Sequence, residues 1–230
     1  SKIFMLFQFL SGIIILKCKL VLNCKITTDR RKNINSAEGY KKKSPFPKSC
    51  CLLCYLMWIW EFTRRILNEN INNAKVLADL KIMDAADYEV SQAVKFGADV
   101  VTILGVAEDA SIKAAVEEAH KNDKQLLVDM IAVQDLEKRA KELDEMGADY
   151  IAVHTGYDLQ AEGQSPLESL RTVKSVIKNS KVAVAGGIKP ETIKEIVAEE
   201  PDLVIVGGGI ANADDPVEAA KQCREAIEGK

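Results

Sequence analysis

From about residue 71 onward, short apolar runs alternate with longer amphipathic stretches. The runs are continuously apolar, which is typical of strands in a parallel sheet that is covered on both faces. The stretches between them repeat apolar residues every three or four positions, which predicts helices. The expected strands are Val76–Ala78, Val100–Leu104, Gln125–Met130, Tyr150–His154, Val182–Ala185 and Leu203–Val206. The expected helices are Asp87–Phe96, Ala110–Lys121, Asp135–Met146, Pro166–Ile177, Pro190–Ala198 and Pro216–Ile227.

Six consecutive βα units predict an α/β fold that makes up most of a (β/α)8 TIM barrel of the phosphate-binding type. The first two βα units would then be atypical or missing. A doubly wound open sheet is the alternative. We assign residues 61–230 to the TIM-barrel domain and residues 1–60 to an atypical N-terminal segment. Gly97 and Gly147 precede two strands at equivalent places, where glycine is expected to end the helix before the strand.

Composition sets the first 70 residues apart. They carry 13 Lys and Arg against 4 Asp and Glu, whereas residues 71–230 carry 18 against 30. Their apolar blocks are shorter than the roughly 20 residues that span a bilayer. The segment is an interfacial membrane anchor, a divergent piece of the fold or a stretch outside it, and we favour the last two over a membrane partner. Only Cys223 lies beyond residue 71, which favours a reducing, cytoplasmic location. A net charge of −3 gives no argument for nucleic-acid binding.

The first expected strand runs out of apolar residues at Asp79, Lys81 and Asp84. Alternate side chains of a strand share a face, so Asp79 and Lys81 should point the same way, with Asp84 following in the loop. Two carboxylates and an ammonium group are costly to desolvate unless they neutralise one another or hold a metal. The plain alternative is a solvated loop with ordinary surface charges.

Polar and glycine-rich positions follow the other strands. In a barrel the active site is built at the carboxyl ends of the strands, where this chain places Asp129, His154, Gly186-Gly187 and Gly207-Gly208-Gly209. Glycine lets backbone N–H groups approach a phosphate, and a following helix N-terminus adds a favourable dipole. His154 has the right pKa range for a general acid or base, although a core histidine is the alternative. Asp129 is either a site carboxylate or the cap of the next helix, and we favour the catalytic site.

The stretch Ala78-Asp79-Leu80-Lys81-Ile82-Met83-Asp84-Ala85 resembles the Asp-x-Lys-x-x-Asp signature of the orotidine-monophosphate decarboxylase suprafamily. Val153-His154-Thr155-Gly156-Tyr157-Asp158 and the glycine motifs at Gly186 and Gly207 resemble the hexulose-phosphate synthases of that suprafamily. The resemblance implies a Mg²⁺-dependent aldol condensation of formaldehyde with D-ribulose 5-phosphate, which gives D-arabino-hex-3-ulose 6-phosphate. It also implies roles for the site residues: Asp79 binds the metal, Lys81 lies beside the enediolate and His154 shuttles the proton, while Gly187, Gly208 and Gly209 hold the phosphate. A homodimer is implied as well, with Asp84 reaching the partner's site.

The first 70 residues depart from the pattern of this family. The family's first two strands supply an Asp and a metal-binding Glu, and residues 1–70 show neither; Cys50 stands where the Glu is expected. Two alternatives therefore stay open: a barrel remnant that is inactive or binds a partner, and a 3-keto-L-gulonate-6-phosphate decarboxylase. By family pattern, the Thr-Gly that follows His154 argues against the decarboxylase.

Overall fold

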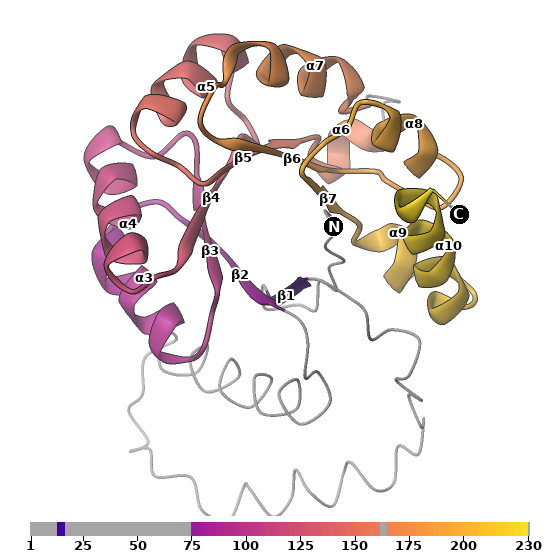
Figure 1. Ribbon diagram of the computed structural model, residues 1–230, viewed down its shortest axis with the longest axis horizontal. Coiled ribbons are helices and arrows are strands. Elements are labelled where there is room, and N and C mark those ends of the chain that lie inside the picture. Colours follow the sequence, from indigo (N-terminus) through magenta and orange to yellow (C-terminus); the bar gives the residue numbers. More distant parts are fainter. Residues whose placement is uncertain (1–12, 17–74, 162–164, 230) are drawn as a thin grey trace, which may run out of the picture.

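The computed structural model describes residues 13–16, 75–161 and 165–229. Its sheet curls around a central space, and the helices lie on the outside (Figure 1). Neighbouring strands follow the chain order from β1 to β7, and β2 to β7 are all parallel. The predicted barrel class with six βα units is thereby confirmed. The six parallel strands are β2 (Lys75–Ile82), β3 (Val100–Leu104), β4 (Gln125–Asp129), β5 (Tyr150–His154), β6 (Lys181–Ala185) and β7 (Leu203–Ile205).

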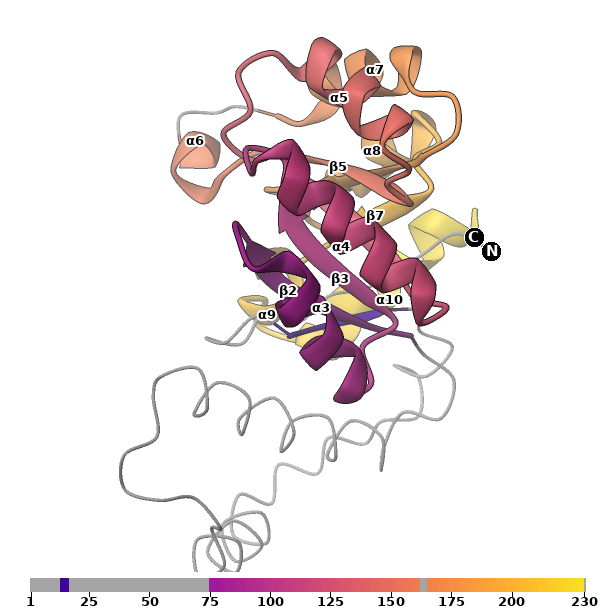
Figure 2. The same ribbon diagram turned by 90° about the vertical axis from the view of Figure 1, so that its left-hand side faces the viewer.

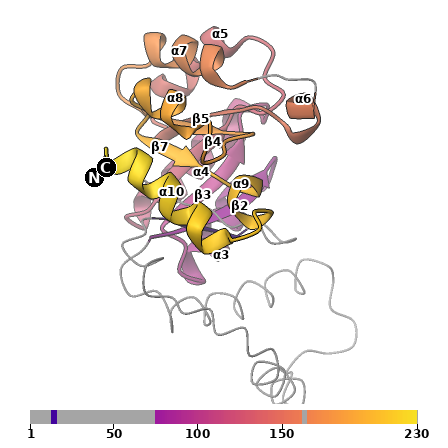
Figure 3. The same cartoon turned by 90° about the vertical axis from the view of Figure 1, so that its right-hand side faces the viewer.

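The helices follow the predicted stretches closely. They are α3 (Ala86–Lys95), α4 (Asp109–Lys121), α5 (Leu136–Glu145), α7 (Leu167–Val176), α8 (Ile193–Ala198) and α10 (Pro216–Glu228), together with two short helices, α6 (Tyr157–Ala161) and α9 (Gly208–Ala211). Figure 2 shows α3 and α4 side by side over β2 and β3, and Figure 3 shows α10 on the opposite side of the barrel. The helix predicted from Pro190 begins three residues later, because residues 189–192 form a turn in which the Lys189 carbonyl accepts from Thr192 and Ile193.

Two separate cores hold the sheet. The larger lies between the sheet and the helices, and residues such as Ile112, Leu143 and Leu170 are fully buried in it. Burial of each such side chain stabilises the fold by about 1.5–3 kcal/mol. The smaller core lies inside the curl; Leu77 and Leu127 belong to it and also line the cavity above it. The inner core therefore forms the floor of the cavity, and the polar ends of the strands lie next to it.

The amino ends of the strands are tied in pairs. Asp99, Asp149 and Asp202 each precede a strand, and each carboxylate accepts a hydrogen bond from the second residue of the strand before it, at 2.8–3.1 Å. Gly97 and Gly147 adopt φ values of 90° and 88° and end helices α3 and α5 as predicted. These contacts fix the strand register at the end opposite the candidate site.

The atypical N-terminal segment predicted for residues 1–60, together with Cys50, lies outside the described residues except for β1 (Ile13–Leu16). Strand β1 pairs with β2 in the antiparallel sense, so it differs from the strands of the βα units. The proposed boundary near residue 60 stays a prediction. Within the part of the chain that the structure describes, no helix is both long enough and apolar enough to cross a membrane.

Candidate active site

The carboxyl end of β2 presents Asp79 and Lys81 on one face, as predicted, and both line the central cavity. The pairing of β2 with β3 shifts register between Ala78 and Ile82, and Lys81 has a φ of 49°, in the left-handed region. A non-glycine residue there costs free energy and is held by its surroundings. Here the Lys81 backbone N–H donates to Thr102 Oγ1 at 3.1 Å, and Thr102 Oγ1 donates to Asp79 Oδ1 at 2.9 Å.

Thr102 was missed by the sequence reasoning. It sits in the middle of β3, and only 3% of its surface is exposed. A hydroxyl group within an otherwise apolar strand was the signal, because a buried hydroxyl needs hydrogen-bond partners. Thr102 therefore links the backbone of Lys81 to the carboxylate of Asp79.

Asp129 joins Lys81 to His154. Its Oδ2 lies 2.6 Å from Lys81 Nζ and 2.9 Å from His154 Nδ1, and its Oδ1 accepts from the Ile131 backbone at 3.0 Å. The Asp129 side chain is only 6% exposed. It does not cap the next helix, because α5 is capped by Asp135. The ends of three strands are thus connected through one buried carboxylate. Asp79 is a second carboxylate near Lys81, with its Oδ1 at 3.4 Å from Lys81 Nζ.

The charges of this cluster are mutually stabilised. Burial alone would raise the pKa of Asp129, but the hydrogen bond and charge of His154, together with Lys81, lower the pKa to about 2. Burial likewise works to lower the pKa of Lys81, but the carboxylates of Asp129 and Asp79 outweigh it and raise that pKa above its usual range. Near neutral pH, Lys81 is therefore a cation and Asp129 an anion.

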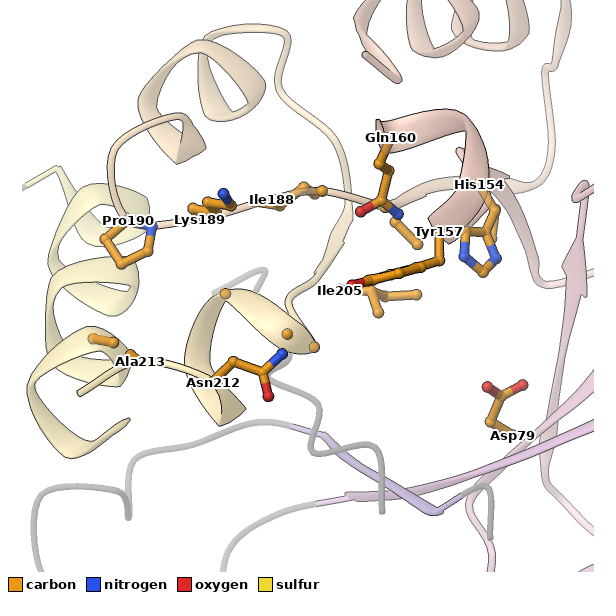
Figure 4. Close-up of a pocket in the computed structure, with 18 of the residues that line it drawn as sticks. Asp79, His154, Tyr157, Gln160, Ile188, Lys189, Pro190, Ile205, Asn212 and Ala213 are labelled. Carbon is orange, nitrogen blue, oxygen red and sulfur yellow. The ribbon is translucent and has the colours of Figure 1, made fainter. Parts of the chain in front are cut away.

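The cavity has a volume of about 990 Å³ and opens at the carboxyl ends of the strands (Figure 4). Gly187, Gly208 and Gly209, the glycines predicted to hold a phosphate, are among its lining residues. A Cβ added to Gly209 would lie 2.2 Å from the Ile188 carbonyl oxygen, so only glycine fits where the two glycine turns meet. Gly186 is equally constrained, because its φ is 103° and a Cβ would lie 2.3 Å from the Thr155 carbonyl oxygen.

Asp84 does not join this cluster within its own chain. Its side chain is exposed in the turn before α3, and it is not among the described residues that line the cavity. Burial, followed by the negative charge of Asp84, raises the pKa of Glu89 on α3. Within its own chain the Asp84 carboxylate therefore influences Glu89 and is not part of the cavity that contains Asp129.

A divalent cation would find one suitable carboxylate here. In residues 13–16, 75–161 and 165–229, no group of three or more His, Cys, Asp or Glu side chains is arranged as a metal site. The hydrogen bond and ion pair that described residues make with Asp79 both involve Oδ1, and Figure 4 shows its carboxylate pointing into the cavity. Mg²⁺ is commonly held by one or two carboxylates together with substrate oxygens and water, so the residues present fit a site completed by substrate.

Three further residues at the cavity were not predicted. Tyr157 and Gln160 come from α6, and Lys189 follows the first glycine turn. Gln160 Nε2 donates to the Thr155 carbonyl at 2.8 Å, and its side chain packs beside Gly187. No periodic signal marked α6 because it has only five residues.

Taken together, the curled parallel sheet and the polar cluster at its carboxyl end define an α/β-barrel enzyme. The sequence model of the Orotidine 5'-phosphate decarboxylase / HUMPS family matches residues 61–223. The chain belongs to this family.

Individual members of the family show where in it this chain belongs. It is 94% identical over 164 residues to the 3-hexulose-6-phosphate synthase of Staphylococcus haemolyticus, a match that covers 71% of this chain and 78% of the relative. It is 93% identical over 162 residues to the 3-hexulose-6-phosphate synthase of Staphylococcus aureus strain MSSA476. This match covers 70% of this chain and 77% of the relative. The crystal structure of the 3-hexulose-6-phosphate synthase from Salmonella typhimurium superposes with a TM-score of 0.71 at 39% identity, covering 74% and 80%. These relatives place the chain in the group of the 3-hexulose-6-phosphate synthases, and they do not favour a decarboxylase or a barrel remnant.

Proposed function

We propose that this chain catalyses the aldol condensation of formaldehyde with D-ribulose 5-phosphate to give D-arabino-hex-3-ulose 6-phosphate. The observation that carries the proposal is the buried Asp129 carboxylate, which holds Lys81 and His154 together above the cavity floor. The reaction requires a base that removes a proton beside a ketone and a positive charge that stabilises the resulting enediolate. This pair of side chains supplies both.

His154 is the proton carrier in this proposal. Its Nδ1 faces Asp129, so in the neutral ring Nδ1 carries the hydrogen and Nε2 is the basic nitrogen. Nε2 takes a proton from C1 of the pentulose. The C1 carbanion form of the enediolate then bonds to the formaldehyde carbon, and the formaldehyde oxygen receives the proton from His154. The proton balance closes, and Asp129 stabilises the imidazolium between the two steps.

Lys81 supplies a fixed positive charge. Its raised pKa keeps it protonated, so its part is to stabilise the enediolate oxygen rather than to accept the proton. Because the ammonium group is already held by Asp129 and Asp79, little reorganisation is needed as charge develops.

Mg²⁺ is the proposed cofactor, with Asp79 as its ligand from the described residues. When bound, the ion supplies Lewis-acid stabilisation of the enediolate oxygens. Asp79 is kept in place by Thr102, whose hydroxyl group donates to it.

In this proposal the substrate phosphate binds at Gly187, Gly208 and Gly209. The first N–H groups of a helix have no partner within it, and Gly208 begins α9. Glycine at these positions lets a phosphate approach the backbone closely. Lys81 and Lys189 are the two lysines among the described lining residues, and Lys81 is already paired, so Lys189 is the cation available to the phosphate.

A second copy of the chain is the proposed partner. Four large apolar side chains near the ends of β2 and β3 are exposed: Leu80 at 39%, Met83 at 49%, Tyr88 at 50% and Val106 at 45%. Large apolar side chains left exposed in this part of the chain favour a protein interface. In such a homodimer Asp84, beside Met83, reaches the partner's cavity.

Mixed protomers test the dimer. Lys81→Ala and Asp84→Ala homodimers should both have strongly reduced activity, whereas unfolding and refolding them together should recover activity. In the mixed dimer one cavity combines an intact Lys81 with an intact Asp84 from the other chain. No recovery, with hybrid dimers formed, would place Asp84 outside the partner's site.

The reaction itself is tested by formaldehyde consumption with ribulose 5-phosphate, with Mg²⁺ and with a chelator. We expect consumption that depends on both the pentulose phosphate and the metal. The matched comparison is release of carbon dioxide from 3-keto-L-gulonate 6-phosphate, which should be far slower. Decarboxylation without formaldehyde consumption would contradict the proposal.

A further inference from the structure

Tyr157 is the most exposed of the large apolar residues in the described part of the chain. It begins α6, three residues after His154, and 81% of its surface is exposed. Nevertheless it lines the cavity, and Figure 4 shows its side chain projecting inward from α6 between His154 and Ile205. An aromatic ring that points into a cavity without being covered there is placed to contact whatever fills that cavity.

The surroundings of Tyr157 fit a covering role. Ile131, Ile188 and Ile205 supply apolar surface at the same cavity. Gly156, directly before Tyr157, packs against Ile131, since a Cβ added there would lie 3.5 Å from Ile131 Cδ1. Asp79, which lies 3.4 Å from Lys81 Nζ, faces α6 from the other side of the cavity (Figure 4). A sugar phosphate bound between them would have Tyr157 on its solvent side.

The proposed reaction gives such a cover a specific consequence. An enediolate has two fates: its C1 can bond to formaldehyde, or it can take a proton and return to the ketose. Protonation competes best when water reaches C1 freely, whereas exclusion of water suppresses such side reactions. The fate of the intermediate therefore depends on what covers it.

We propose that the Tyr157 ring closes over the bound pentulose phosphate and directs its enediolate toward carbon–carbon bond formation by keeping water from C1. The inference rests on the proposed synthase function. Protonation moves one proton from water to C1, the hydroxide left behind takes the proton that His154 first removed, and the ketose is restored. Condensation joins C1 to the formaldehyde carbon, and the proton first removed goes to the new hydroxyl group. The ring is the functional part, because covering needs surface rather than a hydroxyl group.

The experiment measures partitioning in deuterium oxide. Enzyme, Mg²⁺, ribulose 5-phosphate and formaldehyde are mixed, and deuterium at C1 of the recovered pentulose is compared with hexulose phosphate formed. For Tyr157→Ala the ratio of exchange to condensation should rise by about tenfold, which corresponds to about 1.4 kcal/mol in the competing barriers. Tyr157→Phe, which keeps the ring, should match the wild type. Leu159→Ala removes an exposed apolar side chain of the same helix that is not among the described lining residues, and it should leave the ratio unchanged.

Each outcome decides the question. An unchanged ratio in Tyr157→Ala overturns the inference while the synthase function stands. A Tyr157→Phe ratio as high as that of Tyr157→Ala also overturns it, because the hydroxyl group would then be responsible. If the wild type neither exchanges deuterium nor condenses, the proposed function fails and the inference fails with it. Because Tyr157 is exposed, truncation should leave folding intact, and Tyr157→Val is a second truncation that must give the same result.

Discussion

Lys81 Nζ lies 2.6 Å from Asp129 Oδ2, although the two residues are 48 positions apart and belong to strands with another strand between them. The intervening strand β3 contributes Thr102, whose hydroxyl group holds Asp79 on the other side of Lys81. The ammonium group is therefore enclosed by carboxylates from two strands. Its position depends on the curl of the sheet, and its charge depends on both carboxylates.

Lys81→Ala should lower kcat by about a hundred- to a thousandfold, the usual cost of removing one stabilising group at a developing negative charge. The fold should remain, because the Lys81 side chain is 34% exposed and lies at a strand end. Steady-state kinetics and thermal unfolding would measure the two effects. Lys113→Ala, an exposed position on α4, is the control, and wild-type turnover in Lys81→Ala would remove Lys81 from the mechanism.

Asp129→Asn should reduce stability in a way that depends on pH. The pKa of Asp129 is lowered from 3.8 to about 2 on folding, so its carboxylate stabilises the fold above about pH 4 and loses that contribution as the pH falls toward 2. The gap in unfolding free energy between wild type and variant should shrink by about 2 kcal/mol over that range. Denaturant unfolding at a series of pH values measures it. A gap that stays constant down to pH 2 would show that Asp129 is not held as a stabilised anion.

Lys189→Met should raise KM for ribulose 5-phosphate by about tenfold with little change in kcat. Removing one charge-assisted contact to a phosphate weakens substrate and transition state alike. Lys194→Met is the matched control, since Lys194 is exposed on α8 and is not among the described lining residues. Inhibition by inorganic phosphate should weaken in parallel with the rise in KM. Equal KM values in both variants would place the phosphate away from Lys189.

Gly209→Ala and Gly207→Ala form a matched pair. The added methyl group at Gly209 would lie 2.2 Å from the Ile188 carbonyl oxygen, whereas at Gly207 it would meet nothing within 4 Å. Overpacking of this kind typically costs about 1–3 kcal/mol. We therefore expect a lower Tm for Gly209→Ala and nearly unchanged unfolding for Gly207→Ala. Similar melting of the two variants would mean that the glycine turns move apart freely.

The sequence sufficed for much of this architecture. The continuous apolar runs indicated the parallel strands, and the period of two within a strand placed Asp79 and Lys81 on one face. The rule that barrel sites lie at the carboxyl ends of strands brought Asp129 and His154 to the same cavity. These predictions succeeded because each depends on local periodicity or on a general property of the fold.

Other features depend on contacts that periodicity does not reveal. The left-handed backbone of Lys81 follows from the register shift between β2 and β3. Helices α6 and α9 are only five and four residues long, too short to give a periodic signal. Asp84 belongs to the same sequence signature as Lys81 yet lies outside the cavity of its own chain, because the turn before α3 carries it outward. The family's first two strands carry an Asp and a Glu that residues 1–70 do not show. The structure describes only β1 of that stretch, so this departure stays a prediction from the sequence.

The central claim is that this cavity joins formaldehyde to a pentulose phosphate. The most direct measurement supplies isotopically labelled formaldehyde with ribulose 5-phosphate and Mg²⁺ and follows the label by NMR. We predict that the label enters the terminal hydroxymethyl group of a hex-3-ulose 6-phosphate and that Lys81→Ala slows the appearance of this signal by about a hundredfold or more. Label that remains as free formaldehyde in the presence of folded wild-type protein and Mg²⁺ would contradict this claim.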